Sequence, residues 1–368
     1  MARQPASARS RQTRLKTASD EGALSQYVPP ELRTLAHVQT DLPRIARDST
    51  LMQSIEVALA QVPTRHTLWC GDARTAGRLE PGSVHLVVTS PPYWTLKTYR
   101  PHENQLGHVG AYDQFLDELD KVWRRSYDLL VPGGRLVCVV GDVCLSRRKN
   151  DGRHTVVPLH ASIQERCRAL GFDNLAPIIW HKIANAVYEV QNGNGGSFLG
   201  KPYEPNAVIK NDVEFILMQR KPGGYRQPDV SARVLSLISQ ENHHRWFRQI
   251  WSDVTGASTR THPAPYPIEL AERLIRMFSF VGDTVLDPFL GTGTTSVAAA
   301  RSGRNSVGLE VDPHYFRQAV RRLHDATHGL FSSAEVEVRE PPVDEVTSAR
   351  SIARRSARHR IERHARAR

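Results

Sequence analysis

The chain of 368 residues contains few cysteines: Cys70, Cys138, Cys144 and Cys167. No two of them form the Cys-x-x-Cys pair that is typical of a zinc site, and the neighbouring His243 and His244 do not fall on one face of a helix. The sequence therefore predicts no metal site. Cysteines scattered in this way fit a protein of a reducing compartment.

Long apolar runs are also missing. No segment approaches the length of a membrane span, and the basic N-terminus is not followed by the apolar core of a signal peptide. We therefore expect a soluble, cytoplasmic protein with no membrane partner.

Acidic residues are scarce at the C-terminus, where residues 350–368 hold eight arginines against Glu362. This net +7 is most of the formal charge of +11, so the rest of the chain carries only +4. The tail is either an arm that contacts phosphates or a solvated chain end. Residues 1–40, which are basic and rich in Ala, Ser, Gln and Pro, are expected to be disordered and outside the core.

Four parts follow from these patterns: the N-terminal segment 1–40, a helical extension 41–66, a main domain 67–330 and a C-terminal extension 331–368. In the main domain, strand patterns alternate with helical ones. Strands are expected near 67–69, 84–88, 135–140, 176–180, 214–219, 283–287 and 305–310, and helices near 115–130, 159–170, 267–278 and 296–300, with Pro132-Gly133-Gly134 as a helix stop. This alternation predicts an α/β fold with a doubly wound, mostly parallel sheet.

The segment 84–94 runs from a buried strand into Ser90, Pro91, Pro92 and Tyr93. Two prolines must end the strand and leave backbone carbonyls free for a ligand. Free carbonyls, a hydroxyl and an aromatic ring suit a flat heterocycle with an exocyclic amine. Taken alone, this pattern also fits a proline turn with a packed tyrosine, and we favour that interpretation until a second motif is considered.

The segment 283–295 is another buried strand, which ends at Asp287 and turns through Gly291 and Gly293 into a helix. Glycines let a ligand approach the backbone, and the helix start offers unpaired N–H groups. The next strand ends in Glu310, a position from which a carboxylate binds ribose hydroxyls. Together these features predict a nucleoside site.

Absences also narrow the choice of nucleoside. No lysine follows the glycines as in a phosphate-binding P-loop, and Ser296 fills the place of the third glycine of a dinucleotide site. Asp287 would repel a pyrophosphate but suits a sulfonium or an α-amino group. We therefore expect the cofactor to be S-adenosylmethionine.

With both motifs in view, the chain resembles the amino-group DNA methyltransferases, in the permuted branch where the Pro-Pro-Tyr motif precedes the glycine motif. The resemblance covers most of residues 66–326 and rests on segments 70–72, 89–94, 132–140, 179–182, 214–221, 262–278, 287–295 and 303–310. Each segment is a weak signal alone, but their order and spacing are specific. The resemblance implies a Rossmann-like S-adenosylmethionine-dependent methyltransferase fold whose sheet carries an antiparallel edge strand, with residues 214–219 as part of it.

The resemblance also implies residue roles. Ser90 and the Pro91 carbonyl accept hydrogen bonds from the target amine, Pro92 holds the turn rigid, and Tyr93 stacks on a base flipped out of double-stranded DNA. The methionine and ribose end of the cofactor is lined by Asp287, Phe289, Gly291, Gly293 and Thr294, with Glu310 on the ribose hydroxyls and Asp72 towards the adenine.

In the resembling family, serine in the first motif position usually accompanies transfer to N4 of cytosine, and aspartate is commoner with N6 of adenine. The expected function is therefore site-specific methylation of cytosine N4, with a restriction endonuclease as a fitting partner. Ring-carbon methylation is disfavoured, because no cysteine follows a proline to activate the base covalently. N6-adenine methylation is the alternative, and a DNA-binding protein without catalysis is a second; RNA or a protein amide would also offer an amine.

Two insertions, near 186–206 and 221–260, are candidates for target recognition. Asn and Arg side chains there would be able to read base edges. Alternatively, the aromatic residues of the second insertion pack a small subdomain; we favour packing for Trp251 and leave Trp246 open.

Overall fold

The computed structural model describes residues 23–75, 79–182, 211–257, 265–328 and 333–340. The predicted insertion at 186–206 and the Arg-rich tail lie outside the described residues, as do residues 1–22 and 262–264. The second insertion is described as far as residue 257.

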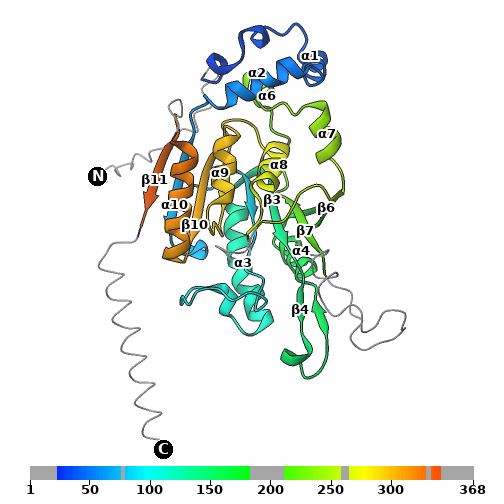
Figure 1. Cartoon of the computed structure of the whole chain (residues 1–368), viewed down its shortest axis with the longest axis vertical. Helices are drawn as coiled ribbons and strands as arrows, with labels where there is room; N and C mark the ends of the chain where they lie inside the picture. The colour runs from blue at the N-terminus through cyan, green and yellow to red at the C-terminus, as the bar shows by residue number, and fades with distance from the viewer. Residues whose placement is uncertain (1–22, 76–78, 183–210, 258–264, 329–332, 341–368) are drawn as a thin grey trace, which may run out of the picture.

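A twisted sheet forms the centre of the described part (Figure 1). Its nine strands are β1 Arg65–Cys70, β2 Val84–Thr89, β3 Leu130–Val140, β6 Asp173–His181, β7 Val213–Arg220, β8 Ile250–Trp251, β9 Thr284–Asp287, β10 Asn305–Glu310 and β11 Glu335–Arg339. They lie in the order β11-β1-β10-β9-β2-β3-β7-β6-β8. The strands of the two sequence motifs, β2 and β9, are therefore parallel neighbours, with Leu86 opposite Val285.

The predicted α/β fold with a mostly parallel sheet is confirmed. Only β7 runs opposite to its neighbours: it pairs antiparallel with both β3 and β6, whereas every other pair in this sheet is parallel. One detail differs, because β7 lies inside the sheet and β8 occupies that edge. The pattern of one strand does not reveal which strands pair beyond it.

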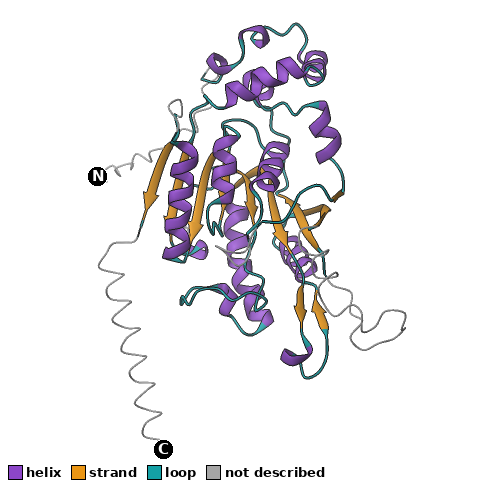
Figure 2. Ribbon diagram, viewed as in Figure 1, coloured by secondary structure: helices purple, strands orange, loops and turns teal. Residues whose placement is uncertain are grey.

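Helices cover both faces of the sheet, as Figure 2 shows in purple over orange. On one face lie α3 Tyr112–Leu129 and α4 Leu159–Ala169; on the other lie α8 Ile268–Phe278, α9 Thr294–Arg301 and α10 Pro313–Thr327. Alternate residues of β3 serve the two faces: Leu136 and Cys138 pack under α3 and α4, and Val137 and Val139 under α8. This is the doubly wound arrangement.

The boundary between α3 and β3 differs from the prediction. The helix ends at Leu129, and β3 starts at once, so Pro132, Gly133 and Gly134 lie within the strand rather than stopping the helix. The pairing of β3 with β2 shifts register in this region, between Val84 and Leu86. Such an irregularity accommodates a proline and glycines in a strand.

The N-terminal segment also differs from the prediction. Residues 1–40 are expected outside the core, yet Val28 and Leu32 are buried against neighbouring helices. This N-terminal layer comprises η1 Ser25–Tyr27, η2 Pro30–Leu32, α1 Val38–Ile45 and α2 Ser49–Leu59, packed on α6 Val230–Leu235. The prediction was based on the composition of residues 1–40, which does not show that Val28 and Leu32 pack against partner helices.

The C-terminal boundary of the main domain differs from the prediction as well. The main domain is predicted to end at residue 330, but β11 pairs with β1 over five residues and extends the sheet. The remaining elements are η3 Ala73–Thr75, η4 Leu106–His108, the β4 Val143–Leu145 and β5 Thr155–Val157 hairpin with η5 Arg147–Lys149, and α7 Gln240–Trp246. Trp246 and Trp251 are both buried, as packing residues are. In the described ranges, no helix has the length and apolar character to cross a membrane.

Candidate active site

The first motif forms a tight turn at the carboxyl end of β2. Pro91, Pro92 and Tyr93 are buried, and Tyr93 is only 5% exposed. Ser90 Oγ donates to the Tyr93 hydroxyl at 3.3 Å. Burial holds the pKa of Tyr93 well above its usual value, so the phenol stays neutral. A polar hydroxyl and an aromatic ring are thus locked side by side.

Trp94 follows the turn with a φ of 44°, a left-handed conformation that is costly for a bulky residue. Its indole Nε1 donates to the carbonyls of Val109 and Gly110, at 2.9 and 3.2 Å. These bonds tie the start of the loop 95–110 to its end. The loop contributes Tyr99, among others, to a pocket at the same edge of the sheet.

The second motif turns at the carboxyl end of β9. Gly291 and Gly293 have φ values of 54° and 85°. A Cβ at Gly293 would lie 3.1 Å from Ala319 Cα of α10, so a side chain there would face both backbone strain and an unusually tight contact with the backbone of α10. The glycine turn therefore lets α9 start close against α10.

The Asp287 carboxylate joins the two motifs. One of its oxygens accepts from Thr89 Oγ1 at 2.7 Å and from the Phe289 amide at 3.0 Å; the other accepts from Thr295 Oγ1 at 2.5 Å and from the Tyr266 hydroxyl at 3.2 Å. Four donors satisfy the accepting capacity of a carboxylate. Burial raises the pKa of Asp287, while these bonds oppose the rise.

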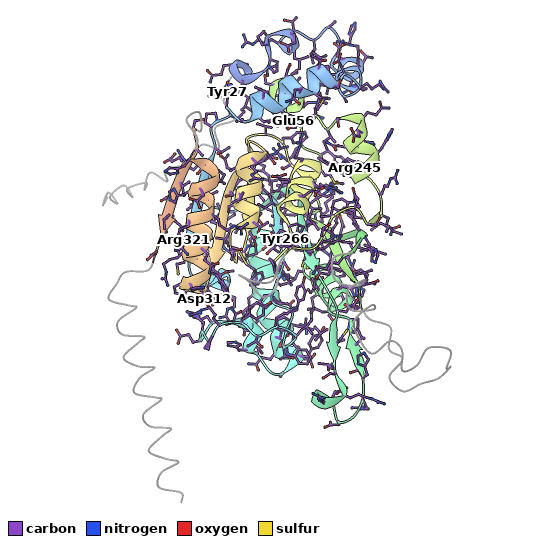
Figure 3. All side chains as sticks on the ribbon, viewed as in Figure 1. Tyr27, Glu56, Arg245, Tyr266, Asp312 and Arg321 are labelled. Atoms are coloured by element: carbon purple, nitrogen blue, oxygen red, sulfur yellow. The ribbon has the colours of Figure 1, made fainter. Side chains whose placement is uncertain are left out.

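Asp287, which the resemblance implies as a cofactor ligand, makes these four bonds within the protein. It does not line the pocket; instead it holds the residue before Ser90 against the glycine turn. The tyrosine that completes this arrangement, Tyr266, carries no local sequence signal of its own. Figure 3 shows it in the middle of the molecule, far from Tyr27 and Glu56 of the N-terminal layer.

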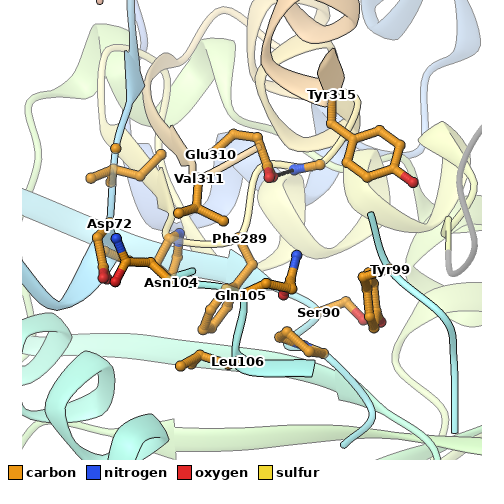
Figure 4. A pocket seen from close by; sticks show the side chains of 16 residues that line it. Asp72, Ser90, Tyr99, Asn104, Gln105, Leu106, Phe289, Glu310, Val311 and Tyr315 are labelled. Atoms are coloured by element: carbon orange, nitrogen blue, oxygen red, sulfur yellow. Dashed lines mark hydrogen bonds between the residues drawn. The ribbon is translucent and has the colours of Figure 1, made fainter. Parts of the chain in front are cut away.

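A pocket opens between the two turns, with an empty volume of about 600 Å³ that includes its mouth (Figure 4). Six predicted site residues line it: Asp72, Ser90, Pro92, Phe289, Gly291 and Glu310. Five do not: Pro91, Tyr93, Asp287, Gly293 and Thr294. Asp72 and Ser90 lie at its two ends in Figure 4, with Phe289 and Glu310 between them.

Sequence reasoning missed part of the lining: Tyr99, Asn104, Gln105, Leu106, Val311 and Tyr315. The first four come from the loop 95–110, whose mixed composition carries no recognisable pattern. Val311 follows Glu310 directly and Tyr315 lies in α10, the next helix; the chain that leaves a strand end next to a ligand was a usable signal for both.

Glu310 sits at the back of the pocket with an unusual electrostatic environment. Its carboxylate accepts from the amides of Gly291 and Asp312, at 2.8 and 2.9 Å. Burial nevertheless raises its pKa to about 8, and these two bonds only partly counter that effect. Both oxygens keep a free lone pair, which suits the two hydroxyls of a ribose.

Asp72 lies where the other end of a nucleoside would reach. Arg74 donates to both of its oxygens, at 2.5 to 3.0 Å, and also contacts Glu118 and Asn104. The guanidinium fixes the carboxylate in one orientation. The residues of the pocket therefore fit a nucleoside with a ribose near Glu310 and a base near Asp72.

The cysteines offer no nucleophile for covalent chemistry. Burial raises the pKa of Cys70 to about 11, holds those of Cys138 and Cys167 far above the usual range and also raises that of Cys144, so the thiols remain protonated near neutral pH. Within the described ranges, no three His, Cys, Asp or Glu side chains gather as metal ligands would.

The sheet is doubly wound, and one of its edges carries a glycine turn, an acid placed to bind ribose hydroxyls and an aromatic turn. These features define the class: a Rossmann-like methyltransferase fold. A family model described as N6_N4_Mtase, DNA methylase, matches residues 84–321. The Type II methyltransferase M.MjaI of Methanocaldococcus jannaschii is 38% identical over 292 residues, which cover 71% of this chain and 90% of that protein. The chain belongs to the N6_N4_Mtase family of DNA methylases.

Two further relatives bear on the details. TTHA0409 of Thermus thermophilus, a candidate DNA modification methylase solved in complex with S-adenosyl-L-methionine, is 53% identical and superposes with a TM-score of 0.61, covering 75% of this chain and 98% of that one. The DNA adenine methyltransferase YhdJ of Escherichia coli is 26% identical over 281 residues, covering 71% of this chain and 84% of YhdJ.

Removing the hydrogen bond between Thr89 and Asp287 should measurably lower the stability of the protein. Thr89→Val keeps the shape but removes a buried donor, so the free energy of unfolding should fall by about 1–3 kcal/mol. Thr89→Ser keeps the hydroxyl, so its free energy of unfolding should fall by less. Denaturant unfolding of the three proteins measures this, and equal stability of the valine and wild-type proteins would contradict the proposed tie.

Proposed function

We propose that this protein transfers a methyl group from S-adenosylmethionine to N4 of a cytosine flipped out of double-stranded DNA, as a member of the permuted branch of its family. The observation that carries the proposal is the single pocket shared by Ser90 of the first motif and Gly291 of the second. The family membership and the cofactor complex of a relative with 53% identity support it.

The cofactor suits the pocket for physical reasons. Glu310 offers two acceptors to a ribose diol, and the fixed Asp72 offers an acceptor to an adenine amine. Phe289 lies between them and gives an apolar surface for the flat nucleoside. Bound there, S-adenosylmethionine would supply an electrophilic methyl group on a sulfonium.

The protein's part of the chemistry is alignment and hydrogen bonding. An amine conjugated with its ring is a poor nucleophile, because its lone pair is delocalised. Ser90 Oγ and the Pro91 carbonyl, which the prolines keep out of the sheet, would accept the amine protons and localise that lone pair. Tyr93 would hold the ring by stacking.

The choice of cytosine rests on Ser90, because serine in this position of the family motif usually accompanies N4 transfer. Adenine N6 is the second candidate, and the similarity to the adenine methyltransferase YhdJ favours keeping it in the test. A companion restriction endonuclease would fit the likeness to Type II methyltransferases.

The direct test identifies the product. Double-stranded DNA of mixed sequence is incubated with the protein and methyl-labelled cofactor, and the digested nucleosides are separated. Label should appear in N4-methyldeoxycytidine, and RNA treated in parallel should remain unlabelled. Label only in N6-methyldeoxyadenosine would reject the cytosine assignment, and DNA binding with no labelled nucleoside would support a scaffold without catalysis.

Replacing Tyr93 separates base handling from cofactor binding. Tyr93→Ala should lower kcat by roughly 100-fold or more, since stacking contributes about 1–3 kcal/mol and misalignment adds to the loss. The Kd for the cofactor should change less than about threefold, because Tyr93 does not line the pocket. Tyr93→Phe should keep most activity. Full activity in the alanine variant would refute the stacking role.

The raised pKa of Glu310 predicts pH-dependent cofactor binding. At pH 7 the ligand-free carboxyl is largely protonated, because its pKa is about 8, whereas ribose hydroxyls prefer to donate to the ionised form. Cofactor affinity should therefore rise between pH 6 and 8, by up to about tenfold per unit, with release of a proton.

Glu310→Gln is the matched control for this titration. It should weaken binding by roughly tenfold or more, since a hydrogen bond to a charged acceptor is lost, and should flatten the pH profile. Isothermal titration in two buffers with different ionisation enthalpies counts the protons released. A wild-type profile parallel to that of the variant would show that another group titrates.

A further inference from the structure

The hairpin of β4 and β5 stands apart from the main sheet. Its strands pair at only three positions, from Val143 opposite Val157 to Leu145 opposite Thr155. In Figure 1 the hairpin extends below the lower edge of the sheet, the edge at which the parallel strands end. Nothing in the proposed mechanism uses this element.

The tip of the hairpin is strongly basic. Residues 146–154 read Ser-Arg-Arg-Lys-Asn-Asp-Gly-Arg-His. This segment contains four cationic residues and one acidic residue, which gives a formal charge of +3 with histidine neutral. Arg147, Arg148, Arg153 and His154 are exposed. Neither Arg148 nor Arg153 has an ion pair with a described residue, whereas Arg166 of the neighbouring α4 is paired with two aspartates. Within the described part of the chain, the charges of Arg148 and Arg153 are therefore not neutralised by an ion pair.

The base of the hairpin is clamped to the body. Asp142, just before β4, lies 2.6 Å from Nδ1 of His160, which follows β5 by three residues. The His160 ring stacks on Phe215 of β7, with ring centres 3.8 Å apart. Both ends of the hairpin are therefore held on the sheet, which makes its direction a property of the fold rather than of a free loop.

The base also adjoins the active site. A Cβ added to Gly141, one residue before Asp142, would lie 3.5 Å from the Tyr93 ring and 3.3 Å from Glu214. The chain therefore runs from Gly141, which lies beside Tyr93, directly into β4. At about 3.3 Å per strand residue, the arginines stand roughly 15–25 Å from Tyr93.

The distance of the hairpin tip from Tyr93 and the positive charge of the tip indicate which partner it binds. DNA carries one phosphate charge per ~1.7 Å of helix axis, so a duplex with its flipped base at Tyr93 presents several phosphates within reach. Arg148 and Arg153 are exposed and form no ion pair with another described residue, so they suit phosphates rather than base edges, which need fixed geometry. We propose that the tip of the β4–β5 hairpin binds the DNA backbone beside the target base without reading sequence.

The inference rests on the proposed function, since it takes DNA as the substrate. Its test compares Arg148→Gln/Arg153→Gln with Arg44→Gln/Arg47→Gln, a control that removes the same charge from exposed positions of α1 and its C-terminal end in the N-terminal layer. Fluorescence anisotropy with two unrelated 30-base-pair duplexes measures Kd over a range of salt concentrations. Thermal unfolding and cofactor binding, measured in parallel, should match the wild type in both variants.

The hairpin variant should bind both duplexes roughly tenfold or more weakly at low salt, and the slope of log K against log salt should fall by about 2. In methylation assays KM for DNA should rise while kcat at saturating DNA is kept. The control variant should change neither the Kd for the duplexes nor the KM for DNA by more than about twofold.

Four outcomes would overturn the proposal. Equal losses in the two variants would show a general charge effect, and a loss confined to one duplex would show base reading. Wild-type protein that binds neither duplex would remove the DNA-binding premise and the proposed function with it, whereas normal wild-type binding with an unaffected hairpin variant removes only the hairpin role.

Discussion

The buried carboxylate of Asp287 is the constraint on which the site depends. A charge at this depth is costly unless every lone pair finds a donor. Its donors come from the end of β2, the glycine turn, the start of α9 and the segment before α8, through Thr89, Phe289, Thr295 and Tyr266. Satisfying one carboxylate therefore fixes Ser90 beside the glycine turn, although about two hundred residues separate the motifs.

Around the hydrogen bonds of Asp287, different strands of the sheet present different parts of the proposed site. The carboxyl ends of β9 and β10 present the glycine turn and Glu310, which suit the proposed cofactor, while β2 presents Ser90 and Tyr93 for the proposed target base. The antiparallel β7 and the hairpin after β3 continue the same edge beyond Tyr93. Cofactor, base and duplex would thus follow one line along the sheet, and the N-terminal layer lies at the opposite edge (Figure 1).

Much of this arrangement could be predicted. Buried strands ending in a double proline or in glycines are local patterns, and the right-handed winding of parallel strands brings their carboxyl ends to one edge. Six of the predicted residues do line one pocket. The loop 95–110, Tyr266 and the burial of Val28 could not be predicted, because each depends on contacts with segments distant in sequence rather than on local periodicity.

The sequence by itself determined the chemical groups and the local turns: where strands stop, which positions need glycine, and which acid ends β10. Those follow from steric limits on φ and from side-chain polarity, which act within a few residues. Only the tertiary structure decided that Asp287 ties the two motifs together, that β7 lies inside the sheet and that Glu310 has a raised pKa. Burial and hydrogen-bond partners set these properties, and both arise only when distant segments pack together.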